Sequence, residues 1–463
     1  KIPSYKYRRT GISEDFFYYC PMIIRGFYLF DPFTVNRELF TQAVQASLHR
    51  HPNLGCNIFS SSNNLYWKQV DSEFKNLNFT EMNHSNEWKK ISEEMQFKEY
   101  PIDVNKYRWK VNIMEHPEQT VLMVGSCHSY SDLYSLNTIL NTFMSYYSVF
   151  TNGKKYDPKE EMLHQERFSA PAESALYPSG LSPEQTEEVK DYIKSKSEEI
   201  SDFRLRTPFN KTGYIPSMEG VNLSYREGEP ENFKSLMAFL KSKQLSLHPF
   251  YISASIIAVY SLTKEQEPDS EKNLSFGLTR NLRNLIQPEL KNLLGVYVDT
   301  QTMRNYNINQ DMTLLEYAFQ LRDNLEKERK NFFYDFIHLS QMELEKGMFS
   351  SKSINHSYDF LITNTGRYEH PTEYTLNSNT SSEKINLRNH LYTHNNVGDS
   401  HTPIVAYLST SKKMTFSVVG LKDTKNKEIS ENIVSRGIEI LEKGSYYSNM
   451  KIKDITESLN LNI

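Results

Sequence analysis

The chain has 463 residues, of which 53 are Lys or Arg and 57 are Asp or Glu, so that its formal net charge is -4. This length exceeds the size at which a single hydrophobic core usually stops growing, and we expect two domains or two pseudo-equivalent halves. The basic residues are scattered along the chain, which argues against nucleic acid as a partner.

The N-terminal part of the chain predicts one amphipathic helix and one hairpin. Apolar residues recur at helical spacing from Thr34 to Arg50, with Thr34 as the expected cap and His51-Pro52 as the expected stop. Further on, residues 109–114 alternate in polarity as a strand does, and the apolar run 121–126 follows across a turn. We interpret these two runs as paired strands.

The pentapeptide His128-Ser129-Tyr130-Ser131-Asp132 directly follows this hairpin. Beyond it, the apolar residues from Leu133 to Tyr147 return to helical spacing. His128 and Asp132 are therefore expected in a strand-to-helix connection, with Asp132 near the helix start, where the helix dipole favours a carboxylate. A His and an Asp at this spacing are frequent by chance, so the surroundings must decide what the motif means.

A linker is expected between the two halves, because residues 151–207 are rich in Lys, Glu, Ser and Pro. Within it, Ser182-Pro183-Glu184-Gln185 has the pattern of a helix start with a capping box. The predicted domains are residues 1–180, with the HxxxD motif, and residues 181–463, including the linker. In the second domain we expect helices over 233–243, 249–262, 313–332 and 429–441, and strands over 293–303, 358–363, 403–409 and 415–421. Because βαβ rhythm and a glycine fingerprint are absent, the prediction is a mixed α/β chain.

The cysteines and the apolar stretches bear on the compartment. Cys20, Cys56 and Cys127 are odd in number and have no CxxC spacing, which fits a reducing compartment and argues against a disulfide framework or structural zinc. The longest mostly apolar stretch, residues 249–262, is too short to cross a bilayer, and the N-terminus does not have the pattern of a signal peptide. We expect a cytoplasmic monomer without a transmembrane segment, for which peripheral membrane contact stays open.

Four segments of the chain resemble the CoA-dependent acyltransferase superfamily. This superfamily contains chloramphenicol acetyltransferase, the plant HxxxD acyltransferases, the condensation domains of peptide synthetases and the fungal alcohol acetyltransferases. The segments occur in the family's order and at comparable separations, and the resemblance covers nearly the whole chain. They are Leu48-His49-Arg50-His51-Pro52-Asn53-Leu54, Tyr100-Pro101-Ile102-Asp103 followed by Trp109-Lys110-Val111, His128-Ser129-Tyr130-Ser131-Asp132, and Leu294-Gly295-Val296-Tyr297-Val298-Asp299-Thr300.

Departures from the family pattern favour one branch of the superfamily. Cys127 stands where many relatives have a second His, and Leu133 stands where they have a Gly, which is expected to alter the turn. The plant DFGWG segment is absent, and Ile362-Thr363-Asn364-Thr365-Gly366 resembles the SNxG strand of fungal alcohol acetyltransferases instead. In that branch, the chain is similar in length to N-acetyltransferases that act on sphingoid-base-like or myriocin-like amines.

The resemblance implies an α/β fold of two chloramphenicol-acetyltransferase-like subdomains, each a mixed sheet flanked by helices, with the active site in a channel between them. It implies an acetyltransferase that uses acetyl-CoA as co-substrate, needs no metal, and acylates the hydroxyl or amine of a hydrophobic small molecule. The favoured acceptor is a long-chain amino alcohol that is N-acetylated, and the alternative is O-acetylation of an alcohol to an acetate ester.

The resemblance also implies roles for particular residues. His128 is the expected general base, since a neutral imidazole with a pKa of about 6.5 is suited to take the acceptor's proton at neutral pH. It would return that proton to the leaving CoA thiolate, so no covalent acyl-enzyme is needed. In the family the motif aspartate points away from the substrate and pairs with an arginine. Asp132 is therefore an expected structural member of the site, and its partner is Arg280 or Arg283.

The negative charge that develops on the thioester oxygen needs a hydrogen-bond donor in a dry site. Thr279, Thr363 and Asn364 are the candidates for this contact with the cofactor.

Other polar residues have simpler interpretations. No GxSxG elbow surrounds Ser129, which disfavours a hydrolase. His49 and His51 lie at a helix end, where capping is expected rather than metal binding. His390 and His394 have a spacing that suits a metal on a helix, but HExxH is absent and their Asn-rich surroundings indicate a loop.

Two further functions stay open. The chain could keep the fold as a non-catalytic module that binds lipid or CoA, although the presence of both His128 and Asp132 at this spacing disfavours it. Peptide-bond condensation with carrier-protein substrates is the other, and the lack of an attached carrier or adenylation segment weakens it.

Overall fold

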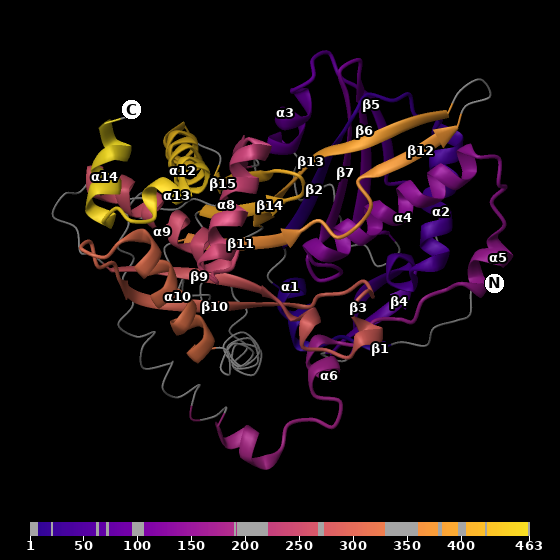
Figure 1. Cartoon of the computed structure of the whole chain (residues 1–463). Coiled ribbons are helices and arrows are strands. Elements are labelled where there is room, and N and C mark those ends of the chain that lie inside the picture. The colour runs from indigo at the N-terminus through magenta and orange to yellow at the C-terminus, as the bar shows by residue number, and fades with distance from the viewer. Residues whose placement is uncertain are drawn as a thin grey trace. The chain divides into compact units, whose positions relative to one another are not determined.

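The computed structural model divides the chain into two compact units (Figure 1). Unit 1 comprises Lys1–Gly180, Asn281–Val298 and Tyr368–Val397, and unit 2 comprises Leu181–Arg280, Asp299–Arg367 and Gly398–Ile463. The structure describes residues 8–19, 22–61, 64–70, 74–94, 106–188, 191, 221–266, 273–328, 360–377, 382–396, 404–421 and 424–461. Unit 1 therefore contains two segments that come from the later part of the chain.

Unit 1 is built on a six-stranded mixed sheet with the strand order β12-β13-β2-β7-β6-β5, accompanied by a small sheet, β1-β4-β3. Neighbours in the large sheet are antiparallel except β5 and β6, which run parallel. The orange strand β13 pairs directly with the indigo strand β2 in Figure 1, so segments far apart in the sequence share this sheet. The strands are β1 (Arg8–Arg9), β2 (Met22–Phe30), β3 (Cys56–Ser61), β4 (Asn64–Gln69), β5 (Leu77–Glu81), β6 (Trp109–His116), β7 (Gln119–Cys127), β12 (Glu373–Asn377) and β13 (Ser382–Asn396).

Both faces of the central strands of unit 1 are covered. All nine residues of β7 are buried, which is typical of a strand that packs on both sides. One face packs against α2 and α4 in a core that includes Trp109, Leu136 and Phe143. On the other face, the ring of Phe27 contacts Trp88 of α3. The helical segments are α1 (Ile12–Tyr19), α2 (Arg37–Arg50), η1 (Pro52–Gly55), α3 (Glu87–Glu94), α4 (Leu133–Thr151), α5 (Pro158–Leu163), α6 (Ala172–Leu176), η4 (Leu282–Asn284) and η5 (Pro288–Leu290).

The hairpin and the helices predicted around the motif are confirmed, with one corrected boundary. Strands β6 and β7 pair antiparallel along their whole length, and α4 follows the motif. Helix α2 ends at Arg50 as predicted, but its N-cap is Asn36 and not Thr34. The reason is local, because the side-chain oxygen of Asn36 accepts a hydrogen bond from the backbone N–H of Leu39 at 3.1 Å.

Unit 2 is built on a second six-stranded mixed sheet, with the order β10-β9-β11-β14-β15-β8. Strand β11 runs parallel to both β9 and β14, whereas β15 is antiparallel to β14 and β8. The strands are β8 (Val221–Glu227), β9 (Asn273–Asn281), β10 (Val298–Asn307), β11 (Phe360–Arg367), β14 (Ile404–Thr410) and β15 (Met414–Leu421). The helices are α8 (Pro230–Ser242), α9 (Leu247–Gln266), α10 (Leu314–Glu328), α12 (Thr424–Glu442), α13 (Gly444–Tyr447) and α14 (Ile452–Leu461).

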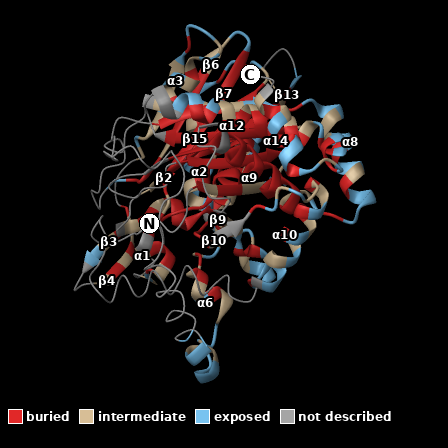
Figure 2. Cartoon of the chain, turned by 90° about the vertical axis from the view of Figure 1, so that its left-hand side faces the viewer, coloured by how far each residue is buried: buried red, intermediate tan, exposed pale blue. Residues whose placement is uncertain are grey.

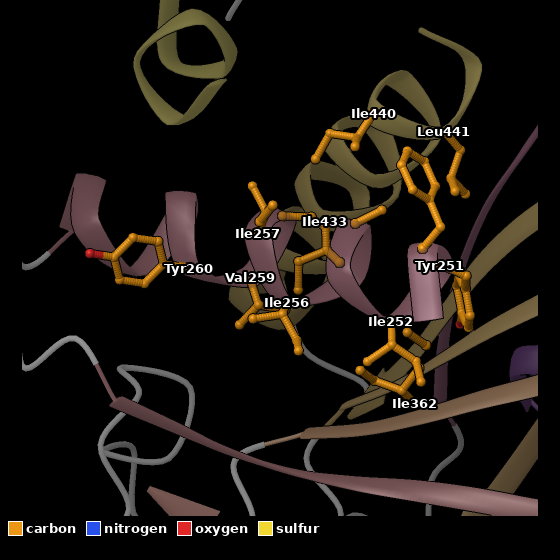
Figure 3. Close-up of a cluster of buried hydrophobic side chains, with 14 of the residues drawn as sticks. Tyr251, Ile252, Ile256, Ile257, Val259, Tyr260, Ile362, Ile433, Ile440 and Leu441 are labelled. Atoms are coloured by element: carbon orange, nitrogen blue, oxygen red, sulfur yellow. The ribbon is translucent and has the colours of Figure 1, made fainter. Parts of the chain in front are cut away.

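Helix α9 forms the centre of the unit 2 core. Residues 249–263 are all buried, as the red ribbon of α9 in Figure 2 shows, and the helix predicted over 249–262 is confirmed. Figure 3 shows Ile256 and Ile257 of α9 in one hydrophobic cluster with Ile433 of α12 and Ile362 of β11. Unit 2 thus has a hydrophobic core of its own.

Two predicted elements differ from the structure in extent. The strand expected over 293–303 begins only at Val298, because backbone groups in residues 294–297 bond to the motif segment instead of to a neighbouring strand. The helix expected over 313–332 is α10, and residues 329–332 lie outside the described part. The predicted capping box is confirmed: the N–H of Gln185 donates to Ser182 Oγ at 3.1 Å, and the N–H of Ser182 donates to Gln185 Oε1 at 2.9 Å.

Among the helices that the structure describes, none is by itself long and apolar enough to cross a membrane. Helices α8 and α9 taken together would meet the same criterion by length and composition, with a bend of 114° between them.

Candidate functional site

The position of His128 is set by the two strands on either side of β7. Its backbone N–H donates to the carbonyl of Met22 on β2 at 2.7 Å, and the N–H of Cys127 donates to the carbonyl of Arg108 at 3.0 Å. The N–H of Tyr130 then donates back to the carbonyl of Cys127 at 3.0 Å, which closes a turn. The imidazole therefore leaves the sheet from a backbone that is hydrogen-bonded on both sides.

One ring nitrogen of His128 is committed to the motif itself. Nδ1 lies 2.9 Å from the carbonyl oxygen of Ser131. A carbonyl oxygen only accepts hydrogen bonds, so Nδ1 must carry a proton, and in the neutral ring Nε2 then keeps its lone pair. Within the described part of the chain, Nε2 has no hydrogen-bond partner, and the side chain is half-buried. This tautomer offers an unprotonated Nε2 to a third molecule.

The surroundings of His128 keep its imidazole neutral. Burial lowers the pKa of His128 below its ordinary value of 6.5, and the Asp132 carboxylate and the Ser131 carbonyl offset only part of that effect. At neutral pH the ring is therefore in the form that can accept a proton.

The carboxylate of Asp132 is fully engaged, but not by His128. As the N-cap of α4, its Oδ1 accepts hydrogen bonds from the N–H of Ser135 at 2.8 Å and from Ser135 Oγ at 2.9 Å. Its Oδ2 accepts from the N–H of Tyr297 at 2.9 Å and forms an ion pair with Arg283. These contacts tie the loop that carries His128 to α4, to Tyr297 and to Arg283.

The structure selects Arg283 and not Arg280 as the partner of Asp132. The Arg283 side chain is 3% exposed, and its second terminal nitrogen donates to Ser135 Oγ and to the carbonyl of Leu293, both at 3.0 Å. Its guanidinium also lies over the rings of Tyr134 and Tyr297, 4.6 and 4.7 Å from their centroids. Arg280 belongs to unit 2.

The segment 294–297, which the family resemblance singled out, binds the motif through its backbone. The carbonyl of Gly295 accepts from the N–H of Asp132 at 3.1 Å and lies 3.0 Å from Ser135 Oγ, whose single proton it shares with Asp132 Oδ1. A Cβ at position 295 would lie 2.8 Å from the Tyr297 ring, so the close approach requires glycine here. Sequence reasoning noted this segment but missed the function of Ser135 and the backbone of Tyr297.

Leu133, which stands where many relatives have a Gly, is the first residue of α4 and packs partly buried against the unit 1 core. Among the described non-glycine residues only Gln244 has a positive φ, so the turn before α4 needs no left-handed residue.

The three predicted cofactor-binding residues lie close together in unit 2. Thr363 on β11 and Thr279 on β9 each follow the last registered pair of these parallel strands, Ile362 with Leu278. The Asn364 side chain accepts from the N–H of Gly366 at 2.9 Å.

The Nδ2 of Asn364 lies 3.2 Å from Nδ1 of His248. Burial and the charge of Arg280 lower the pKa of His248 to about 4, so this imidazole is neutral at physiological pH.

The interpretation of His390 and His394 as loop residues is wrong. Both are buried on β13, where His390 faces Tyr28 and His394 faces Ile24 of β2. Four residues along a strand span about 13 Å, so these two side chains cannot share one metal ion. Burial lowers the pKa of His390 to about 4 and, together with the charges of His128 and Arg25, that of His394 to about 3.

His49 and His51 also have protein partners. The Nδ1 of His51 lies 2.8 Å from Glu166 Oε2 and its Nε2 lies 3.0 Å from Thr142 Oγ1, while Nδ1 of His49 lies 2.6 Å from the hydroxyl of Tyr156. Across the described ranges, no group of three or more His, Cys, Asp and Glu side chains is arranged to hold a metal.

The comparisons with known proteins agree on the fold. No protein-family model matches the chain, and no curated protein is significantly similar in sequence. A trichothecene 15-O-acetyltransferase from Fusarium sporotrichioides superposes with a TM-score of 0.69 at 10% identity, over 93% of this chain and 94% of its own. The first condensation domain of the calcium-dependent antibiotic synthetase gives 0.69 at 9% identity, over 97% and 99%.

A third solved structure is the starter condensation domain of rhizomide synthetase in complex with C8-CoA and Leu-SNAC, with a TM-score of 0.66 at 9% identity, over 96% of both chains. At such identities the likeness concerns the fold. It confirms the expected pair of mixed sheets flanked by helices, which is the fold of condensation domains and CoA-dependent acyltransferases.

Proposed function

We propose that this protein is a CoA-dependent acyltransferase in which His128 is the general base. The observation that carries the proposal is the hydrogen bond between Nδ1 of His128 and the Ser131 carbonyl, which leaves the Nε2 lone pair available. The engagement of Asp132 by Arg283 supports it, because the carboxylate then holds the loop and does not compete for the proton. The shared fold supports the reaction class, since one neighbour is an acetyltransferase and another was solved with C8-CoA.

The proposed reaction is a direct transfer. Nε2 of His128 takes the proton from the hydroxyl or amine of the acceptor as that oxygen or nitrogen attacks the thioester carbonyl carbon. The carbon–sulfur bond then breaks, and the CoA thiolate takes the proton from Nε2, so the base is restored and the products are an ester or amide and free CoA. General-base catalysis of this kind contributes about 100- to 10,000-fold to the rate.

The finer assignments are part of the same proposal. The donor is acetyl-CoA, and the acceptor is a hydrophobic long-chain amino alcohol that is acetylated on nitrogen, with O-acetylation of an alcohol as the alternative. Thr279, Thr363 and Asn364 are proposed to contact the cofactor. For these three residues, alanine variants are expected to raise the KM for the acyl-CoA while leaving the melting temperature of the protein within a few degrees.

Condensation on a carrier-bound thioester is the second candidate function. It is favoured by the likeness to condensation domains, whose solved chains are covered to 96% and 99%. The two functions differ in the donor, because a condensing enzyme would act on an acyl-pantetheine carrier and would leave free acetyl-CoA untouched.

A single assay separates these functions. The purified chain is given acetyl-CoA or octanoyl-CoA with a panel of long-chain amino alcohols, primary alcohols, amines and aminoacyl thioesters. Release of the CoA thiol is followed, and the product is identified by mass spectrometry. We expect acceptor-dependent thiol release that is lost in His128→Ala. Equal turnover by His128→Ala would contradict the general-base role, and CoA binding without any product would favour a non-catalytic module.

A further inference from the structure

A residue from outside the motif lies flat on the imidazole of His128. The ring of Phe17, on α1, is stacked on it with 3.8 Å between the ring centroids and 8° between the planes. Phe17 is buried, at 7% exposure. At this separation no water molecule fits between the two rings, so one whole face of the imidazole is dry.

The position of Phe17 is set by the way in which α1 is docked. The N–H of Ile12 donates to Glu173 Oε1 on α6 at 2.9 Å, and the N–H of Gly11 donates to Glu14 Oε2 at 2.7 Å. Glu14 is in turn paired with Arg8 at 2.6 Å. Helix α1 is thus fixed at its first turn by partners that do not belong to the motif.

The approach of the chain at Gly11 is close. A Cβ at this position would lie 2.3 Å from Glu173 Oε1 and 2.4 Å from Cβ of Pro171. Only glycine allows α1 to enter at this distance. A substitution at Gly11 therefore shifts α1, and with it Phe17, while the side chains that touch His128 keep their chemical identity.

We propose that Phe17 is a positioning residue for the base, which holds the imidazole in the plane that keeps Nδ1 on the Ser131 carbonyl and closes one face of the ring to water. This inference rests on the proposed function. A rotation of the ring about its Cβ–Cγ bond would break the Nδ1 hydrogen bond and would also push into the Phe17 ring. Phe17 covers neither the Nε2 edge of the His128 ring nor its opposite face, so an acceptor would approach the ring there.

The pH dependence of the base distinguishes positioning from simple packing. Asp132, from the same loop, favours the charged form of His128, and the charge of His128 in turn lowers the pKa of His394 on β13. Neither Asp132 nor His394 is altered when Phe17 is replaced. Removal of the covering ring lets water reach the imidazole, so the acidic limb of the pH–rate profile should move to higher pH.

The test compares Phe17→Ala, Phe17→Leu and Phe17→Tyr with the control Phe74→Leu. Phe74 is matched because its ring is stacked on Trp109 in the same unit, at 4.1 Å and 20°. In Phe17→Ala we expect kcat to fall by about 10- to 100-fold, which is what a misplaced catalytic group costs, with the KM for acyl-CoA changed little. In Phe17→Ala the acidic limb of the pH–rate profile should shift upward by about half a pH unit. Phe17→Tyr should restore both kcat and the position of this limb, whereas Phe17→Leu should lower kcat but leave the limb at its wild-type pH.

The control should lose melting temperature without any change in kcat or in the pH profile. An unchanged kcat and acidic limb in a folded Phe17→Ala protein would overturn the inference.

A chemical readout makes the inference independent of activity. The rate at which diethyl pyrocarbonate modifies His128, followed by peptide mass spectrometry, should rise in Phe17→Ala and in Gly11→Ala and should stay at the wild-type rate in Phe74→Leu. If the wild-type protein releases no CoA with any acceptor, the proposed function fails while this rate still tests the stack. If the wild type is active and Phe17→Ala changes neither the turnover nor the rate of modification by diethyl pyrocarbonate, the positioning role alone is wrong.

Discussion

Two histidines in unit 1, His51 and His128, each follow the end of a helix or strand, yet their ring nitrogens differ in hydrogen bonding. His51 uses both, because Nδ1 meets Glu166 at 2.8 Å and Nε2 meets Thr142 at 3.0 Å. The Thr142 hydroxyl donates its own proton to Thr138 at 2.8 Å, so Nε2 of His51 must be a donor. His128 uses only Nδ1, on a carbonyl within its own motif.

The difference lies in where the carboxylates are directed. Glu166 accepts directly from His51, whereas Asp132, only four residues from His128, is held by Arg283, Tyr297 and Ser135. A carboxylate bonded to the imidazole would favour its charged form. Both ring nitrogens of His51 are thus used in structural hydrogen bonds, whereas His128 stays neutral with a lone pair on Nε2, as the proposed general base requires.

The largest expected effect comes from replacing each of the two histidines separately. His128→Ala should lower kcat by about 100- to 10,000-fold, with a loss of stability limited to its one hydrogen bond to Ser131 and its stack on Phe17. His51→Ala should destabilise the protein by about 1–3 kcal/mol, since Glu166 Oε2 and Thr142 Oγ1 each lose a hydrogen bond, and should keep kcat within a few-fold. Thermal unfolding and turnover, measured on both variants, check this. Equal losses of turnover in the two would erase the distinction.

The ion pair between Asp132 and Arg283 can be removed by replacing either residue. Arg283→Met should cost about 3–5 kcal/mol because it leaves a buried carboxylate unpaired, and Asp132→Asn should lose both stability and turnover as the loop loosens. A double variant should recover part of the loss, which urea unfolding would measure as a coupling energy.

The exposed pair Lys384 with Glu373, at 2.8 Å in the same unit, is the matched control, and Lys384→Met should barely move the urea midpoint. Full turnover in a folded Asp132→Asn protein contradicts the loop-fastening role.

The backbone contacts of residue 295 give a smaller effect. Gly295→Ala should cost about 1–3 kcal/mol, since its Cβ would meet the Tyr297 ring at 2.8 Å and force that side chain or the loop to move. Gly55→Ala serves as the control, because the nearest atom to its Cβ would lie 4.0 Å away. The difference in their unfolding midpoints tests the contact, and equal midpoints would show that the segment gives way freely.

The smallest effect concerns the anchor of α1. Burial is the main cause that raises the pKa of Glu173 from 4.5 to about 6. A raised pKa means that the folded state binds the proton more tightly, so this contribution to stability is complete below pH 4.5 and is lost as the pH rises through about 6. Glu173→Gln keeps an acceptor for Ile12 and cannot titrate.

The melting temperature of Glu173→Gln, relative to wild type, should therefore increase between pH 5 and pH 7 by a few degrees, as a burial-shifted carboxyl of this kind implies. A difference that stays constant over this range would rule out Glu173 as the titrating group.

The sequence predicted the elements that local pattern specifies. The hairpin β6–β7, the helix α4 behind Asp132 and the end of α2 at Arg50 follow from apolar periodicity and capping chemistry, and all are confirmed. The choice between Arg280 and Arg283 could not follow from pattern, because the two residues are three positions apart. It depends on the turn η4, which brings only Arg283 onto Ser135 and Leu293.

Strand β13 was missed for a different reason. Its Asn and His residues suggested a loop, but Asn389, His390 and His394 are buried on a strand that pairs with β2 from the other end of the sequence. The hydroxyls of Tyr392 on β13 and Tyr28 on β2 both donate to Asn137 of α4. Such pairing joins residues more than 100 positions apart, and local composition carries no sign of it. The contact between Phe17 and His128 escaped notice for the same reason.

The protonation of the His128 ring tests the central claim most directly. Nitrogen-15 chemical shifts of the ring, recorded against pH in histidine-labelled protein and assigned with His128→Gln, report which nitrogen carries the proton. The account predicts the Nδ1–H tautomer with a bare Nε2 at neutral pH, and a titration midpoint below 6.5. A proton on Nε2, or an imidazolium at neutral pH, would contradict it.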